Sequence, residues 1–416
     1  MPIEGIEIDT LIVGAGQAGL AMSAHLHTHN ITHLIVERKR IAERWRSERW
    51  DSFVANGPAW HDRFPEYPFA NAAPDDFPTK TQIVNYFEQF AASINAPVRC
   101  GVTVEALYRN SDKSGFRAET SEGPIECRRV VVATGAFQKP VVPGVIPHES
   151  GIIQMHSSEY RNPSQLPPGA VLVVGGGSSG VQIVDEILHD GRRVYLSVGN
   201  HKRPPRRYRG QDSSWWLDRL GRWDMRPVGN NTKHVPIAVS GSNGGWTVDF
   251  RELAQRGVVL LGHTESYRDG VLHFAPDLRE NIEKGEQDYL SFLKECDELI
   301  EREGLDFPEE REAHQIMADS ACLNHPQLEI DLKKEGISVV IWATGYSSDF
   351  EWVRIDDAFD PSGRPCHDAG VSCVPGLYFI GLPFLSRLGS AFIFGVWDDA
   401  KHLSKHVAQI DSGTTG

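Results

Sequence analysis

The stretch from Thr10 to Glu37 constrains the fold of this chain more than any other feature. An apolar run leads into Gly14-x-Gly16-x-x-Gly19, a helical pattern follows, and a second apolar run ends at Glu37. Glycines at this spacing permit a tight turn and let a pyrophosphate approach the main chain, while the start of the helix offers free N–H groups to an anion. An acid about 20 residues further on can accept hydrogen bonds from a ribose. The stretch therefore predicts a dinucleotide-binding unit, with candidate contacts at Gly14, Gly16, Gln17, Ala18, Gly19, Glu37 and Arg38.

A second stretch, from Val171 to Gly180, repeats this pattern. An apolar strand enters Gly175-x-Gly177-x-x-Gly180, and a helix with regularly spaced apolar residues follows. Where the first unit has its acid, this one has Val198, followed by a cluster of lysine and arginine. A basic cluster suits a 2′-phosphate and indicates NADPH rather than NADH, although a solvated basic loop would have the same composition. The candidate contacts of this second nucleotide are Gly175, Gly177, Ser178, Ser179, Gly180, Lys202 and Arg203.

Two further strands end in the same sequence, Ala-Thr-Gly, at residues 133–135 and 343–345. A buried strand that ends in small residues lets the main chain come close to a bound group. A later strand runs into Gly381-Leu382, and Gly389-Ser390 could begin either an ordinary helix or one whose N–H groups face a cofactor carbonyl. These elements add candidate cofactor contacts at Ala133, Thr134, Gly135, Thr344, Gly345, Gly381, Leu382, Gly389 and Ser390.

The segment from residue 38 to residue 62 is rich in arginine and tryptophan. Its composition fits equally well a surface loop and a lid over a flat ring system and its phosphates. The lid would place Trp45 and Arg46 at the cofactor. Asn56 opens the turn signal Asn-Gly-Pro, so this asparagine could be a turn residue alone.

The composition is that of a soluble globular protein, with 40% hydrophobic and 24% charged residues in a chain of 416. The net charge of −14 argues against nucleic acid as the main partner. No apolar run approaches the ~18 residues of a membrane helix, and no leader pattern precedes the first strand, so we expect a cytoplasmic protein. The six cysteines include no CxxC pair and no metal-type cluster, so we expect neither a dithiol site nor a metal. Three clustered tryptophans, at 215, 216 and 223, are expected in the core or an interface, although they could also form a substrate wall.

Taken together, these motifs resemble the class B flavin-dependent monooxygenases, including the YUCCA-type enzymes and related bacterial flavoproteins. The resemblance covers nearly the whole chain and is weakest between residues 210 and 330. It implies an α/β fold with two Rossmann-like dinucleotide-binding domains, the second inserted into the first. Residues 1–155 and 335–416 would form the FAD-binding domain, and residues 156–334 would form the NADPH-binding domain.

The resemblance also implies roles for single residues. The first fingerprint, with Val104 added, would hold FAD, and the second would hold NADPH. Asn56 is similar to the asparagine that in many family members contacts the oxygen adduct of the flavin and the nicotinamide, which makes it the catalytic candidate. His156 is similar to a histidine of the linker between the domains.

The implied activity is an NADPH-dependent oxygenation. NADPH would reduce FAD by hydride transfer, and the reduced flavin would react with O2 to a flavin C4a-(hydro)peroxide that delivers one oxygen atom to a small organic substrate. Two alternatives fit the same motifs: an FAD/NADPH-dependent reductase that passes electrons to another acceptor, and a redox-sensing flavoprotein that binds both nucleotides without turnover. The size of the chain is compatible with a homodimer.

Overall fold

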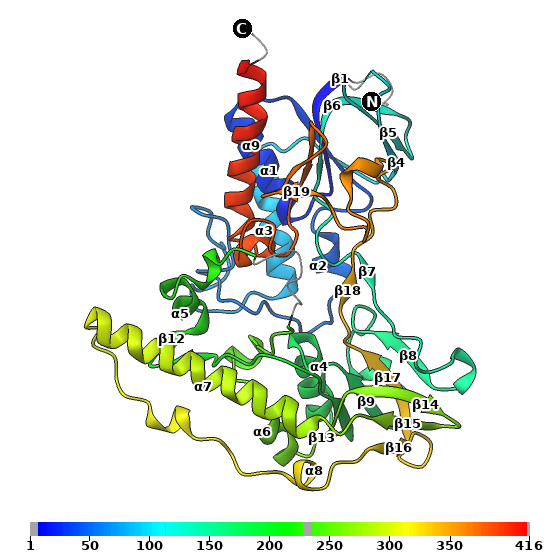
Figure 1. Ribbon diagram of the computed structural model, residues 1–416, viewed down its shortest axis with the longest axis vertical. Coiled ribbons are helices and arrows are strands. Elements are labelled where there is room, and N and C mark those ends of the chain that lie inside the picture. The colour runs from blue at the N-terminus through cyan, green and yellow to red at the C-terminus, as the bar shows by residue number, and fades with distance from the viewer. Residues whose placement is uncertain (1–6, 113, 228–234, 414–416) are drawn as a thin grey trace.

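A computed structural model describes residues 7–112, 114–227 and 235–413 and arranges them as two units, each built around its own sheet (Figure 1). The chain begins in the first unit, crosses to the second and returns to end in the first. Strand β7 (Lys139–Pro140), which leaves the first unit, pairs with β18 (Tyr346–Ser347), which leaves the second. In the described part of the chain, no helix has both the length and the apolar character that a membrane span requires.

The first sheet is parallel at its centre, in the order β21-β6-β1-β2-β3. Residues Leu11 and Ile12 of β1 are fully buried, as expected for a parallel strand covered on both faces. The elements of this unit are β1 (Glu7–Val13), α1 (Gln17–Thr28), β2 (His33–Glu37), α2 (Glu43–Ser47), α3 (Lys80–Ser93), β3 (Val98–Cys100), β4 (Val104–Arg109), β5 (Phe116–Thr120), β6 (Ile125–Val132), β19 (His367–Asp368), β20 (Val371–Ser372), β21 (Leu377–Phe379) and α9 (Val396–Gly413).

The second sheet is parallel throughout, in the order β13-β10-β9-β17-β8. A short antiparallel sheet, β14-β15-β16, and the long helix α7 lie beside it (Figure 1). The elements of this unit are β8 (Ile153–His156), β9 (Ala170–Val174), α4 (Ser178–His189), β10 (Val194–Ser197), β11 (Arg207–Tyr208), β12 (Gln211–Asp212), α5 (Ser213–Arg219), α6 (Phe250–Gln255), β13 (Val259–Leu261), β14 (Thr264–Arg268), β15 (Val271–Phe274), α7 (Leu278–Glu303), α8 (Ala321–Asn324), β16 (Glu329–Asp331) and β17 (Ile337–Trp342).

Two strands require a correction of the expected division. Strand β17 pairs with β9 and β8 in the second sheet, although residues 335–416 were expected to close the first unit. Strand β8 also lies in the second sheet, although the first unit was expected to extend to residue 155. An apolar strand that ends in Ala-Thr-Gly has the same local pattern in either sheet, so only its long-range pairing shows which sheet it joins.

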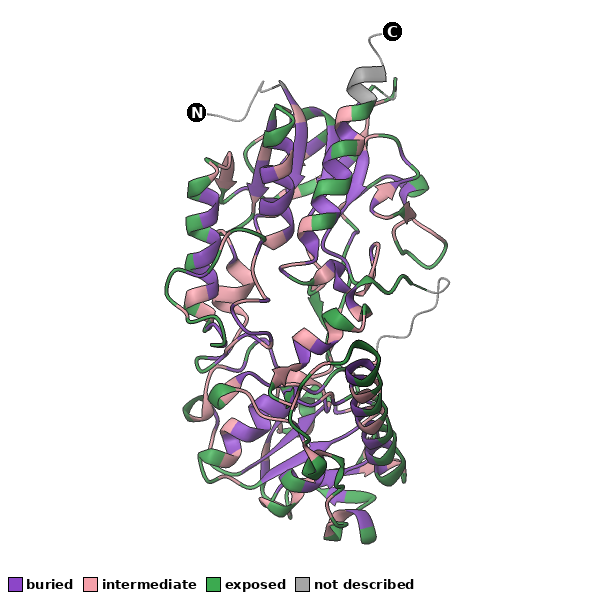
Figure 2. Ribbon diagram, turned by 90° about the vertical axis from the view of Figure 1, so that its left-hand side faces the viewer, coloured by how far each residue is buried: buried purple, intermediate pink, exposed green. Residues whose placement is uncertain are grey.

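The buried residues form the two sheets and the inner faces of the helices, and exposed residues cover the outside (Figure 2). A smaller core lies under α7, where fully buried Trp216 packs with Leu293 and Leu299. This core anchors α5, which lies beside the boundary between the units (Figure 1).

Candidate functional site

The first glycine turn, between β1 and α1, is closely packed on one side and open on the other. Gly14 has a φ of +110°, and a Cβ there would lie 2.7 Å from Ala133 O. A Cβ at Gly19 would lie 1.9 Å from Gly14 O, so helix and strand approach each other as only glycine allows. A Cβ at Gly16, by contrast, would meet no atom of the described residues within 4 Å. The open side therefore faces the start of α1, where no side chain caps the helix.

The carboxylate of Glu37 lies beside this turn. It accepts hydrogen bonds from Ala15 N at 3.0 Å and from Lys39 N at 2.9 Å. Arg38 follows it and is exposed. Ala15, which the motif treats as a variable position, therefore holds the acid in place through its main chain. This contact has no side-chain signal in the sequence.

The C-terminal segment joins the same turn. Gln17 Nε2 donates to Ala391 O at 2.7 Å, and a Cβ at Gly381, just before Leu382, would lie 2.8 Å from Ala18 Cβ. The interpretation of Gly389-Ser390 as a helix start is wrong: these residues form a short 3₁₀ turn, Leu388–Ala391, and α9 begins at Val396. Gly395 lies directly before α9 and against the main chain of Gly389, where a Cβ would come within 2.0 Å of its oxygen. Gly395 is not among the residues predicted from the sequence, although glycine is one of the residues found at the start of a helix.

Residues 133–135 lie at the carboxyl end of β6, and Gln138 fastens them. Gln138 Nε2 donates to Thr134 Oγ1 at 3.0 Å and to Gly135 O at 2.7 Å. Arg44, in α2, donates to Gln138 O at 3.0 Å. This short helix thus lies against the end of β6.

The other candidates of the expected lid are held by neighbours. Arg46 pairs with Glu88 at 2.5 Å, and half-buried Trp45 has the Arg49 guanidinium 5.4 Å from its ring centroid. Val104 begins β4 and pairs with Thr120, whereas Val102 N donates to the main-chain oxygen of Glu37 at 3.0 Å. Val102, rather than Val104, is therefore the residue that lies next to Glu37.

The second glycine turn, between β9 and α4, has the same construction as the first. Gly175 has a φ of +119°, and a Cβ there would lie 2.4 Å from Ala343 O. A Cβ at Gly180 would lie 1.8 Å from Gly175 O. Residues 343–345 thus occupy the position in this unit that residues 133–135 occupy in the first. His156 reinforces this arrangement, because its Nε2 lies 3.0 Å from Gly345 O.

The start of α4 differs from the start of α1. The main-chain N–H and the hydroxyl of Ser178 both donate to Ile237 O, at 2.8 and 2.7 Å. A Cβ at Gly177 would lie 3.3 Å from Pro236 Cβ. The chain at residues 236–237 therefore covers the first turn of α4. Within the part of the chain that the structure describes, Ser179 N, one residue further along, donates no hydrogen bond to this segment.

The basic cluster after β10 separates into exposed and buried members. Lys202 is 53% exposed at its side chain, and its Nζ lies 3.3 Å from Asp288. Arg203 is 3% exposed, lies 3.3 Å from Asp249 and donates to Val248 O at 3.2 Å. Of the two candidates for a 2′-phosphate, Lys202 is thus accessible and Arg203 is enclosed.

Asn56 lies where the two units meet. Its side-chain oxygen accepts from Gln182 Nε2, on α4, at 2.7 Å, and its main-chain oxygen accepts from Arg206 Nη1 at 2.6 Å. Arg206 is itself buried and pairs with Asp212 at 2.6 Å. Gln182 had no signal in the sequence, because its importance depends on contacts between distant segments. Arg206 belongs to the basic cluster that was expected to suit a 2′-phosphate, but the structure buries it against Asn56 and Asp212.

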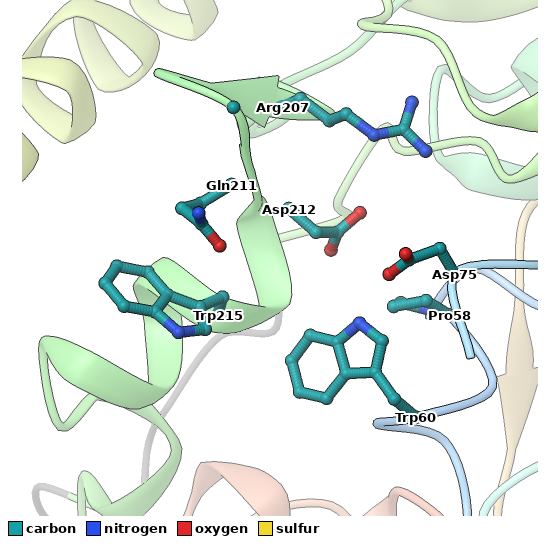
Figure 3. Close-up of a pocket in the computed structure, with 8 residues that line it drawn as sticks. Pro58, Trp60, Asp75, Arg207, Gln211, Asp212 and Trp215 are labelled. Atoms are coloured by element: carbon teal, nitrogen blue, oxygen red, sulfur yellow. The ribbon is translucent and has the colours of Figure 1, made fainter. Parts of the chain in front are cut away.

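A cavity of about 550 Å³ lies next to the Asn56 loop (Figure 3). Its volume falls in the range of small-molecule sites. The structure separates the three clustered tryptophans: Trp215 lines this cavity, Trp216 is fully buried, and Trp223 packs against Phe392 and Phe394. The residues that line the cavity are Pro58, Trp60, Asp75, Arg207, Gly210, Gln211, Asp212 and Trp215.

Comparisons with known proteins show the family and the fold of the chain. The sequence profile of the pyridine nucleotide-disulphide oxidoreductase family matches residues 11–226. An uncharacterized CzcO-like oxidoreductase of Geobacillus kaustophilus is 34% identical over 95% of this chain and 97% of its own length. The indole-3-pyruvate monooxygenase YUCCA1 of Oryza sativa is 32% identical over 46% of this chain and 47% of its own. A solved flavin-containing monooxygenase of Stenotrophomonas maltophilia superposes with a TM-score of 0.68 over 97% of this chain and 99% of its own, at 17% identity, and shares the fold.

Together with the fold and its two glycine turns, the family match and the CzcO-like relative define an oxidoreductase of the mixed α/β class. The chain belongs to the pyridine nucleotide-disulphide oxidoreductase family, and within it to the proteins that are like class B flavin monooxygenases.

Proposed function

We propose that this chain is an NADPH-dependent FAD monooxygenase that oxygenates a small organic substrate. The first unit would bind FAD and the second, inserted into it, would bind NADPH. One observation carries the proposal: Asn56, from the loop that follows the first nucleotide turn, is hydrogen-bonded to Gln182 on the helix that follows the second. This contact ties both units to one polar residue, and Pro58, two residues further along the same loop, lines a cavity of ligand size.

The first turn fits FAD. The open space before Gly16 leaves room for a pyrophosphate at the uncapped start of α1. The Glu37 carboxylate, held by two main-chain N–H groups, is available to a ribose. When bound, the flavin would supply hydride acceptance and oxygen activation, and the protein would supply position and hydrogen bonds.

The second turn fits NADPH if a phosphate can reach the start of α4, which residues 236–237 cover in part. Gly175 and Gly180 give it the same close packing as the first turn, and Lys202 offers an accessible cation to a 2′-phosphate. However, Ile237 O already accepts the N–H of Ser178. A phosphate at this helix must therefore displace residues 236–237 or bind one residue further along, at Ser179.

Asn56 would act as a hydrogen-bond donor to an oxygen that gains negative charge during the reaction. Fixed donors are effective at such an oxygen because they need not reorganise when the charge develops. The Asn56 side chain is held between two units, so its amide group can be fixed in this way. The substrate would enter from the cavity that Trp60 and Trp215 line.

An isotope experiment tests the proposal. The purified protein is analysed for bound FAD, supplied with NADPH and ¹⁸O2, and offered a thioether, a cyclic ketone and an aromatic 2-oxo acid as probes. One ¹⁸O atom in any product supports the proposal. Bound FAD with NADPH-dependent reduction of menadione, but unlabelled probes, would instead identify a reductase. Absence of FAD binding would overturn the proposal.

A further inference from the structure

Two side-chain amides meet at the boundary between the units. Gln182, which is 5% exposed, donates from Nε2 to Asn56 Oδ1 at 2.7 Å and to Val239 O at 3.2 Å. The two amides are 126 residues apart in the sequence. Both bonds start from the same nitrogen, which has two N–H groups to give.

The donor and acceptor roles in this chain of hydrogen bonds can be assigned in only one way. A main-chain carbonyl can only accept, so Val239 O requires the NH2 group of Gln182 to face it. The second N–H of that group then points to Asn56, which must present its side-chain oxygen. Among the described residues, no hydrogen-bond partner faces the side-chain nitrogen of Asn56, so this nitrogen is the free end of the amide. A carbonyl in one segment thus determines which end of Asn56 faces outward.

The main chain of Asn56 is fixed as well. Arg206 donates to its carbonyl oxygen at 2.6 Å, and the same guanidinium binds Asp212 at 2.6 Å and Ser213 Oγ at 3.0 Å. These bonds restrain the main chain of Asn56 when the side-chain contact changes. The orientation of the Asn56 amide rests on Gln182.

We propose that Gln182 is a positioning residue that holds the NH2 group of Asn56 toward the reacting oxygen. The inference rests on the proposed function, because it assumes that Asn56 acts as a donor. An oxygen with developing negative charge is stabilised by the N–H groups of an amide and repelled by its carbonyl oxygen. A flipped Asn56 would therefore be no better than a missing one.

Gln182→Glu tests this orientation with almost no change of shape. The new carboxylate has no N–H group for Val239 O or for Asn56 Oδ1, so Asn56 must turn its NH2 group inward and its oxygen outward. Gln89→Glu is the matched control, because Gln89 is exposed on α3 and the change of charge is the same. Gln182→Leu removes both bonds without adding a charge and replaces Gln182→Glu if that variant does not fold.

The activity readout needs no substrate. FAD-loaded protein is given NADPH in air, and the rate of hydrogen peroxide release is followed. Gln182→Glu should release peroxide about tenfold faster, as expected for the loss of one hydrogen bond, and Gln89→Glu should match the wild type. Because Gln182 acts through Asn56, Gln182→Glu should add less than about twofold to Asn56→Leu. Full additivity, or no change in Gln182→Glu, would overturn the proposal.

The second readout follows the amide itself. The ¹H–¹⁵N signals of the Asn56 side chain, identified by their loss in Asn56→Leu, should shift in Gln182→Glu and remain in place in Gln89→Glu. Unshifted signals would overturn the proposal even if peroxide release changed. This measurement separates the two hypotheses: a wild type that binds no FAD refutes the proposed function, while the amide signals still decide the orientation of Asn56.

Discussion

The sharpest test of the nucleotide-binding geometry compares Gly19→Ala with Gly16→Ala. The Cβ of Gly19→Ala would lie 1.9 Å from Gly14 O, about 1.5 Å inside an ordinary contact, and the facing atoms belong to the main chain. Helix α1 cannot move away easily, because Leu20, Ala21 and Met22 are fully buried. Overpacking of this kind costs about 1–3 kcal/mol or more, and we expect about 3 kcal/mol here because no flexible side chain can yield.

Gly16→Ala should behave in the opposite way. Its Cβ would meet no atom within 4 Å in the part of the chain that the structure describes, and the φ of −89° suits any residue. The FAD-free protein should therefore keep its stability within about 1 kcal/mol, because the change lies outside the packed core. FAD should bind at least about tenfold more weakly, a loss of 1.4 kcal/mol, because the methyl group occupies the approach of the pyrophosphate.

Urea unfolding of the FAD-free proteins and fluorescence titration with FAD measure the two effects separately. The reasoning would be refuted if Gly19→Ala unfolded like the wild type. It would also be refuted if Gly16→Ala lost as much stability as Gly19→Ala, since the space before Gly16 would then not be open.

Three other predictions follow from buried and exposed charges. Lys202→Ala should weaken NADPH binding several-fold and leave NADH binding nearly unchanged, whereas Arg203→Ala should lower the free energy of unfolding by about 3 kcal/mol without that selectivity. Titrations with both nucleotides and urea unfolding separate the two effects. Equal losses of affinity for both nucleotides in Lys202→Ala would contradict the first expectation. Burial lowers the pKa of His156, so the wild type should lose stability as the pH falls below about 6.5, where the unfolded chain binds the proton first. His156→Gln should lose less stability over this pH range, measured by urea unfolding. The same dependence of stability on pH in both proteins would count against this prediction. Burial raises the pKa of Asp399, so the charge of this carboxylate opposes folding at neutral pH. Asp399→Asn should therefore be more stable than the wild type at pH 7 and lose this advantage near pH 4. Equal melting temperatures of the two proteins at pH 7 would contradict this prediction.

The two glycine turns were predictable in detail from the sequence. Gly14 and Gly175 adopt positive φ values, and Gly19 and Gly180 face main-chain oxygens closer than any Cβ allows. These requirements are local, since they involve a strand, a turn and the first turn of a helix. A residue pattern that satisfies them therefore identifies the unit before its partners are known.

Contacts across long sequence separations were not predictable. Strand β17 was predicted to lie in the first unit but joins the second sheet, and Arg203 was predicted to contact a 2′-phosphate but is enclosed. Neither pattern records what packs against these residues. The sequence predicted a role for Gly389 but not for Gly395, although the two glycines lie against each other. Sequence patterns describe the faces of an element, and they do not name the element that covers each face.

By itself, the amino-acid sequence determined that this protein has two strand–turn–helix units with glycine turns of the dinucleotide-binding pattern, because the steric rules for glycine act within a few residues. Only the tertiary structure decided that Asn56 meets Gln182 and that Val239 sets the direction of both amides. A hydrogen bond between side chains depends on angstrom-scale placement of segments that are more than a hundred residues apart, and this placement results from the packing of both units together.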